Sequence, residues 1–415
     1  MECTEKMKLE FISRFLKSIN RCLVPKLAKN YDEGIEHFEF ELRNKNMDKN
    51  FQLFVESFGD ITKDDFEKNP AIVSNMVNLY KELSCDCPWN KSKAKDVAKE
   101  MNTFFEVITT VNLDAVFRKN DVFNSQIIFD KCLEDLHSKI TYETLKMYPA
   151  QIEVYMSIIA DLQEYDVELM PSKLFPITLL LIEDYTVTNK KKGLQSCSVL
   201  LQSLKPKDFQ NGNYYEVIYR SLKKNLVERD MDIVKLTHIC LLALLKIVPD
   251  SGKRNILDEL YTTTLDQLLT DSNLYKKAAL FNFATSIIQW HKDNCANIKI
   301  FKQIICDNLD ICTNDAVSGI ILSPLLKCLE KWITFCWPVW KFNTDHKMLS
   351  ALFKVLYICK EDHLVKQTHK LIVTFICLCN NSEQKLIISN LDKERDVECT
   401  VYREKIKNIK ADLKI

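Results

Sequence analysis

Apolar residues recur at helical spacing along most of the chain, and from about residue 171 the helical segments come in pairs separated by short polar turns. Residues 171–185 form the first segment of one pair, residues 186–189 are a polar turn, and the second segment covers 190–204. Each pair predicts an antiparallel helical hairpin. The other predicted hairpins join 214–228 to 232–248, 256–269 to 274–290, 298–311 to 315–335, and 347–359 to 363–379.

The turns within these hairpins repeat at a nearly constant interval. They begin at Asp230, Asp271, Thr313 and Glu361, which are 41, 42 and 48 residues apart, close to the period of about 40 to 47 residues of HEAT-type repeats. An Asp, Asn or Thr in such a turn can accept hydrogen bonds from the unpaired amides that open the second helix. Because each hairpin exposes an apolar side that only a neighbouring hairpin can cover, we predict an all-α fold, an α-solenoid of HEAT/armadillo-like helical hairpins.

The segments before this array are amphipathic but less regular. We therefore predict a less regular N-terminal helical region over 1–147, a HEAT-like repeat array over 148–390, and a C-terminal cap or tail over 391–415. Polar connectors are expected at 60–69 and 85–90. The predicted helices of the irregular part and of the following pair cover 7–27, 71–83, 92–111, 124–140 and 151–165.

Composition favours the same class of protein. Six glycines and ten prolines among 415 residues leave little material for the turns of an all-β fold. The 57 basic residues are balanced by 57 acidic ones, so the chain lacks the positive charge that provides most sequence-independent nucleic-acid affinity. For the longest basic run, Lys190 to Lys192, a solvated turn is a better explanation than a phosphate groove.

The N-terminus lacks the basic-then-apolar plan of a signal peptide, and no apolar run approaches the length of a membrane-spanning helix. The sixteen cysteines are scattered, and many lie inside apolar runs, which is typical of reduced, buried thiols. We therefore expect no nucleic-acid or membrane partner, and a location in the cytoplasm with the nucleus as an alternative.

The motifs of catalysis and cofactor binding are not found. The six glycines are never closer than 19 residues, which excludes phosphate-binding loops, dinucleotide fingerprints and nucleophile elbows. A zinc site built from Cys359, His363, Cys377 and Cys379 would need ligands about 20 Å apart along one helix. Cys85-x-Cys87 lacks a second pair of ligands at a suitable spacing, which favours an ordinary loop. We expect no enzymatic activity, no cofactor and no metal.

Three lysines occupy one register near the start of second helices: Lys235, Lys276 and Lys366. They could line a partner-binding ridge. The alternative is a ladder of intramolecular contacts to acids of the turns, such as Asp230 and Asp271.

Three tryptophans, Trp332, Trp337 and Trp340, concentrate aromatic area where the helix over 315–335 is expected to end. Tryptophan is enriched at the energetic centres of interfaces, but the core of a hairpin also accommodates it, so both interpretations stay open.

One segment resembles a known family. Phe175-Pro176-Ile-Thr-Leu-Leu-Leu-Ile182-Glu183-Asp184-Tyr185, followed by Asn189-Lys190 and Gly193-Leu194, resembles the signature of the Tel-two-interacting protein two family. Similarity continues over 222–245 and returns at 336–338 and 347–357, so that it covers about residues 170–390. Glu183 stands where the family often has Asp. The matching signature residues are Pro176, Asp184, Tyr185, Asn189, Lys190 and Gly193.

This resemblance implies a scaffold without catalytic activity, the smallest subunit of the TTT co-chaperone complex. Family members bind the large HEAT-repeat subunit, Tti-one, and through it the Tel-two subunit. The complex cooperates with the ninety-kilodalton heat-shock chaperone and its R2TP adaptor to mature phosphatidylinositol-3-kinase-related kinases. The alternative function is that of a HEAT-repeat transport or nuclear adaptor that binds an extended peptide. Such an adaptor would be expected to carry a ladder of inward-facing Asn and Trp residues.

Overall fold

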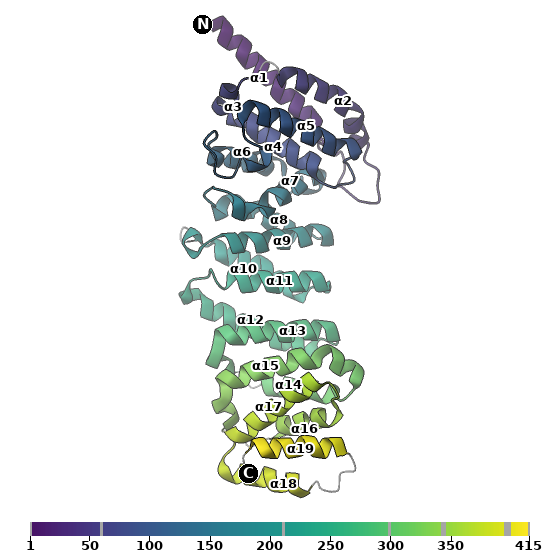
Figure 1. Cartoon of the computed structure of the whole chain (residues 1–415), viewed down its shortest axis with the longest axis vertical. Helices are drawn as coiled ribbons and strands as arrows, with labels where there is room; N and C mark the ends of the chain where they lie inside the picture. Colours follow the sequence, from purple (N-terminus) through teal and green to yellow (C-terminus); the bar gives the residue numbers. More distant parts are fainter. Residues whose placement is uncertain are drawn as a thin grey trace. The chain divides into compact units, whose positions relative to one another are not determined.

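The computed structural model describes residues 2–58, 61–209, 212–297, 300–341, 346–393 and 400–413. Over these residues all regular structure is helical, and successive helices pair into hairpins, which confirms the predicted α-solenoid (Figure 1). The helices form two compact units, Met1–Ile247 and Val248–Ile415. This boundary falls inside the array predicted over 148–390, and the division into three parts at 147 and 390 stays a prediction.

The first unit contains helices α1 to α11, several of them separated by short 3-10 turns. From α6 onward they form two layers, since α9 packs against α7 and α11, whereas α8 packs against α6 and α10. The helices are α1 Glu2–Cys22, α2 Phe38–Phe58, α3 Lys63–Lys68, α4 Pro70–Ser84, α5 Ser92–Thr109, α6 Ser125–Lys139, α7 Pro149–Ala160, α8 Pro171–Glu183, α9 Val187–Ser203, α10 Tyr214–Lys224 and α11 Met231–Leu244.

Helix α3 corrects the sequence prediction, because it lies in the segment 60–69 that was expected to be a polar connector. Thr62 precedes the helix, and its backbone amide donates to the Asp65 carboxylate at 3.1 Å. This bond is half of a capping box, which lets a short polar segment start a helix.

The irregular helices meet at one buried acid, Glu82 on α4. Its carboxylate accepts hydrogen bonds from Arg43 on α2 at 3.4 Å, from the amide of Val24 at 2.8 Å and from Gln151 on α7 at 3.0 Å. Burial raises the pKa of Glu82 to about 7, although the charge of Arg43 acts in the opposite direction. Glu82 therefore ties the first helices of the unit to α7.

The second unit repeats the two-layer arrangement. Helix α15 packs against α13 and α17 in one layer, and α14 packs against α12 and α16 in the other. The last helix, α19, packs against α16 and α17 and buries Tyr402, Ile406 and Ile409. The helices are α12 Asp250–Thr270, α13 Leu274–His291, α14 Ile300–Ile311, α15 Asp315–Lys341, α16 Lys347–Ile358, α17 Asp362–Leu378, α18 Asn381–Lys393 and α19 Thr400–Asp412.

Helix α15 contains a kink at Cys336, whose φ of −108° and ψ of 18° are not helical. The first of its two helical segments ends at Phe335, as predicted, and the second continues to Lys341. The kink precedes Pro338 by two residues, and a proline ring inside a helix displaces the preceding turn and removes a hydrogen bond. The chain bends here and continues as a second helical segment.

The predicted capping chemistry occurs in three of the four repeated turns. Asp230 accepts from the amides of Asp232 and Ile233, Asn273 accepts from those of Tyr275 and Lys276, and Asn314 accepts from that of Ala316. Glu361 makes no such side-chain bond at the start of α17.

Helices α8 and α9 approach each other closely at Gly193. A Cβ atom at position 193 would lie 2.5 Å from the backbone nitrogen of Ile182 and 2.8 Å from the carbonyl carbon of Leu181. These distances are too short for any side chain, so the absence of a Cβ lets the two helices touch.

Replacing Gly193 by Ala should therefore lower the free energy of unfolding by about 1–3 kcal/mol, because the helices must move apart. The matched variant Gly319→Ala lies in α15 with nothing within 4 Å of its new Cβ, and it should raise the free energy by up to about 1 kcal/mol. Urea unfolding followed by circular dichroism measures both. Changes of the same sign in the two variants would contradict the packing described for α8 and α9.

Candidate functional site

Two of the signature residues, Asp184 and Asn189, meet at the turn between α8 and α9. Asp184 is 8% exposed. Its Oδ2 accepts hydrogen bonds from Thr186 Oγ1 at 2.7 Å and from Asn189 Nδ2 at 2.6 Å, and its Oδ1 lies 3.0 Å from Lys146 Nζ. We call Lys146, Asp184, Thr186 and Asn189 the turn cluster.

Burial raises the pKa of Asp184, but the hydrogen bonds from Asn189 and Thr186 and the ion pair with Lys146 outweigh burial, so the pKa lies below its usual range. Lys146 comes from the 3-10 turn just before α7, and its Nζ also lies 3.0 Å from the ring centroid of Tyr185. Tyr185 is 81% exposed and covers the ammonium group from the solvent side. The turn cluster thus joins α8 and α9 to the preceding hairpin.

The basic run 190–192 lies near the start of α9 and does not form the solvated turn that the sequence suggested. Each lysine is paired with an acid of a neighbouring hairpin, which explains why three like charges are tolerated side by side. The ion pairs are Lys190 with Glu228, Lys191 with Asp230 at 3.2 Å and Asp232 at 2.8 Å, and Lys192 with Glu153 of α7.

Both groups of interactions hold neighbouring hairpins in place. The Asp184 carboxylate has bonding partners on both oxygens and is buried, so it cannot act on a substrate in this arrangement. Gly193 is buried in the contact between α8 and α9, and Pro176 lies exposed on α8. Four of the six signature residues therefore hold neighbouring helices together: Asp184, Asn189, Lys190 and Gly193.

The three lysines of the predicted ridge differ in their surroundings. Lys276 Nζ lies 3.0 Å from the carboxylate of Asp271, and the Lys276 side chain is 10% exposed. This is the intramolecular contact that the sequence offered as the alternative, so Lys276 does not belong to an exposed ridge. Lys235 and Lys366 are exposed, and their part in partner binding stays a prediction.

The three tryptophans divide in the same way. Trp332 is 1% exposed and stacks on Phe301 with ring centroids 5.0 Å apart. Trp340 is 2% exposed and donates its Nε1–H to the carbonyl of Phe375 at 2.9 Å. Both belong to the core of the second unit. Trp337 is 44% exposed and is the member of the group that a partner could reach.

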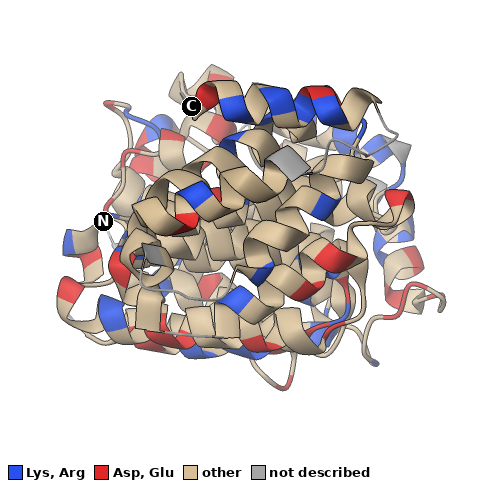
Figure 2. Ribbon diagram, turned by 90° about the horizontal axis from the view of Figure 1, so that it is seen from below, with Lys and Arg blue, Asp and Glu red and all other residues tan. Residues whose placement is uncertain are grey.

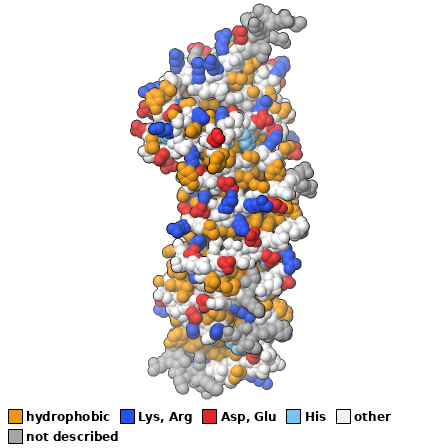
Figure 3. All heavy atoms as spheres, turned by 180° about the vertical axis from the view of Figure 1, so that it is seen from behind, with side chains coloured by type: hydrophobic (Ala, Val, Ile, Leu, Met, Phe, Trp, Pro, Cys, Tyr) orange, Lys and Arg blue, Asp and Glu red, His pale blue; other side chains and the backbone are white. Residues whose placement is uncertain are grey.

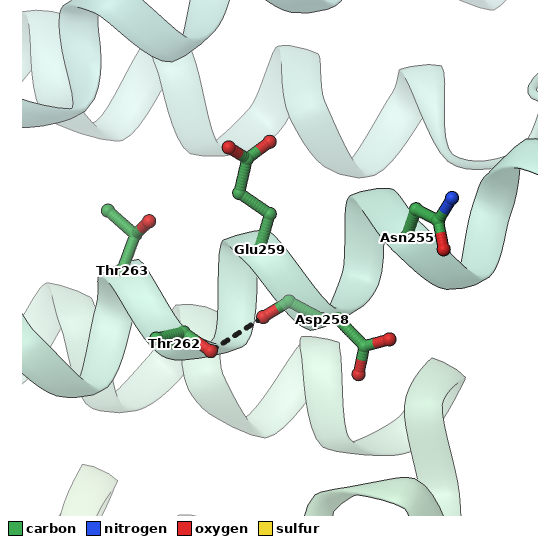
Figure 4. Close-up of a pocket in the computed structure, with 5 residues that line it drawn as sticks. All are labelled: Asn255, Asp258, Glu259, Thr262 and Thr263. Atoms are coloured by element: carbon green, nitrogen blue, oxygen red, sulfur yellow. Dashed lines mark hydrogen bonds between the residues drawn. The ribbon is translucent and has the colours of Figure 1, made fainter.

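Polar side chains also gather at one place on α12. A shallow polar depression on α12 is lined by Asn255, Asp258, Glu259, Thr262 and Thr263 (Figure 4). All five come from one helix, and the Thr262 hydroxyl donates to the backbone carbonyl of Asp258 at 2.9 Å. Asp258 also lies 2.8 Å from His291 Nε2, so these groups are already engaged within the chain.

In the part of the chain that the structure describes, one group of side chains could hold a metal ion: Cys85, Cys87 and Glu153. The sequence analysis favoured an ordinary loop for the two cysteines. It missed Glu153, because 66 residues separate it from Cys87 and no local pattern marks it.

Over the described residues, basic and acidic residues are interspersed along most of the helices in Figure 2. On the face drawn in Figure 3, hydrophobic side chains form small groups among charged ones. None of the described helices combines the length and the apolar character that crossing a membrane would require.

The stacked helical hairpins define the class of the protein, which is an α-solenoid. No protein-family model matches the chain. The chain is similar to TELO2-interacting protein 2 of Rattus norvegicus, with 24% identity over 161 residues, 39% of this chain and 32% of that protein. The match therefore spans about a third of the relative's length, and it confirms a segment-level resemblance. A solved structure of an engineered protein is similar with a TM-score of 0.43 and 11% identity, over 97% of this chain and 94% of that one.

Replacing Asp184 by Asn should lower the free energy of unfolding by about 3 kcal/mol, since Lys146 is left as an uncompensated, largely buried charge. Combining Asp184→Asn with Lys146→Met should cost less than the sum of the two single changes. Glu183→Gln is the matched control, because it breaks the neighbouring but exposed ion pair with Lys224 and should cost less than about 1 kcal/mol. Urea unfolding measures all four variants.

The pH dependence provides a second test of the same cluster. Because the folded-state pKa of Asp184 lies below its ordinary value of 3.8, its stabilising contribution is present above that value and is lost as the pH falls through the folded pKa. The stability of Asp184→Asn should therefore fall less steeply in acid than that of the wild type. The cluster would be ruled out if the losses of unfolding free energy of Asp184→Asn and Lys146→Met simply added in the double variant, and if the stability of wild type and Asp184→Asn fell equally steeply in acid.

Proposed function

We propose that the chain is a non-enzymatic scaffold subunit of the TTT co-chaperone complex. In this role it binds the large HEAT-repeat subunit, Tti-one, directly and the Tel-two subunit through it. The observation that supports the proposal most is the similarity to TELO2-interacting protein 2, a protein named for its interaction with TELO2. The predicted signature, which lies in α8 and α9, points to the same family.

The proposed work of the complex is to mature and stabilise phosphatidylinositol-3-kinase-related kinases together with the ninety-kilodalton heat-shock chaperone. A scaffold supplies a semi-rigid surface for this work and needs no reacting group of its own. The inward-facing turn cluster and the inter-hairpin ion pairs agree with this role, because they fix the hairpins against one another. The proposed location is the cytoplasm, with the nucleus as an alternative.

The second unit offers the more suitable contact surface for a helical partner. Trp337 is 44% exposed and Tyr357 is 50% exposed, and Lys366 lies exposed on α17. Accessible aromatic side chains supply the apolar area at the centre of an interface, and surrounding charges orient the partner. A peptide adaptor would instead need a ladder of accessible tryptophans, and Trp332 and Trp340 are buried.

The test measures binding of the purified full chain to the purified large HEAT-repeat TTT subunit by calorimetry. The wild type should bind, and Trp337→Ala should weaken binding by about tenfold or more, the effect typical of a central interface aromatic. Tyr142→Ala is the matched control, because Tyr142 is an aromatic residue of the first unit that is 89% exposed, and it should leave the affinity unchanged.

Absence of binding by folded wild-type protein would refute the proposed function. Equal losses for Trp337→Ala and Tyr142→Ala, with both variants folded by circular dichroism, would instead refute the assignment of the contact to the second unit.

A further inference from the structure

The loop between α4 and α5 carries two thiols that the packing holds in place. Cys85 directly follows α4 in an extended conformation, and Cys87 follows it by two residues. The Asn90 side-chain amide donates to the carbonyls of Glu82 at 2.7 Å and Cys85 at 2.9 Å, and the Asn90 backbone amide donates to the carbonyl of Cys87 at 2.9 Å. These bonds fix the backbone on both sides of the two thiols.

The same loop is anchored to α7, which brings a carboxylate to the thiols. Trp89 is 3% exposed and packs with Ala150 of α7, and Cys87 lies against this cluster. Glu153 follows Ala150 by three residues and therefore lies on the same side of the helix. The two Sγ atoms are 2.8 Å apart, and these atoms and a Glu153 carboxylate oxygen all lie within 4.8 Å of one another.

We propose that Cys85, Cys87 and Glu153 form a zinc-binding site, with water as the fourth ligand. Tetrahedral zinc with Zn–S distances of about 2.3 Å would place the two sulfur atoms about 3.8 Å apart, so the thiols need to separate by about 1 Å. Cys85 and Cys87 are both partly exposed, which permits this small rotation and gives the ion access. Two soft ligands and one carboxylate suit zinc better than copper(I), which prefers sulfur alone.

The three ligand groups carry negative charge once the thiols are deprotonated, which suits a divalent cation. Lys192 pairs with Glu153 Oε1 and thereby orients the carboxylate. The carboxylate also distinguishes this site from a simple dithiol switch, since a disulfide would gain nothing from it.

Bound zinc would join the α4–α5 loop to α7, and through Lys192 it would be linked to α9. This proposal is independent of the proposed scaffold function, because it concerns only the first unit.

The test titrates the reduced, chelator-treated full chain with zinc ion in competition with a chromophoric zinc chelator. The wild type should bind one zinc equivalent more than Cys85→Ser/Cys87→Ser, and Glu153→Gln should weaken binding by about tenfold or more. The matched control is Cys359→Ser/Cys377→Ser, which removes two accessible thiols of the second unit and should retain the wild-type stoichiometry.

A measurement on the wild type alone avoids any folding defect of the variants. Zinc should protect Cys85 and Cys87 from alkylation, as mapped by peptide mass spectrometry, whereas Cys377 should react equally with and without the ion. Equal alkylation of Cys85 and Cys87 in both states, or equal zinc stoichiometry in the wild type and the Cys85→Ser/Cys87→Ser variant, would overturn the site. Unchanged affinity in folded Glu153→Gln would overturn the three-ligand arrangement.

Discussion

The structure depends on the fact that a hairpin of two helices cannot bury its apolar sides alone. In each unit a helix packs against its hairpin partner and against the equivalent helices of adjacent hairpins, as α9 does with α8, α7 and α11. Burial of apolar surface drives this stacking, but it is not directional. The order and spacing of the hairpins must therefore come from specific contacts at the turns and at the points of closest approach.

The α8–α9 hairpin shows how such contacts work. At its turn, Asp184 binds Lys146 from the preceding element, and within its interface Gly193 lets the two helices touch. The following ion pairs of the run 190–192 reach both neighbours. The residues that make the signature recognisable are thus mainly those that hold one hairpin in the stack, and partner contacts are to be sought on exposed side chains elsewhere.

Periodicity was sufficient to predict most helices, because apolar spacing directly reflects the buried face. Pro171 begins α8, as expected for a proline in the first turn of a helix. Helix α3 was not predicted, because it depends on the polar capping box of Thr62 and Asp65 and not on apolar spacing. The sequence could not predict which of the lysines at equivalent positions pair with acids and which are exposed. Lys276 pairs with the acid of its own turn, but the carboxylate of Asp230 lies 3.2 Å from Lys191 of another hairpin, and Lys235 is exposed. Only the tertiary packing decides between these outcomes, and the same packing brings Glu153 to Cys85 and Cys87.

Hydrogen exchange of the intact wild type and Asp184→Asn, followed by mass spectrometry, tests most directly whether the turn cluster holds the stack. In a solenoid a local loss of packing spreads to adjacent repeats. The account predicts faster exchange in α8 and α9 and in the helices packed on them, α7, α10 and α11, with α13, α15 and α17 of the second unit unchanged. Faster exchange confined to the turn at 184–189, or an equal increase in both units, would contradict it.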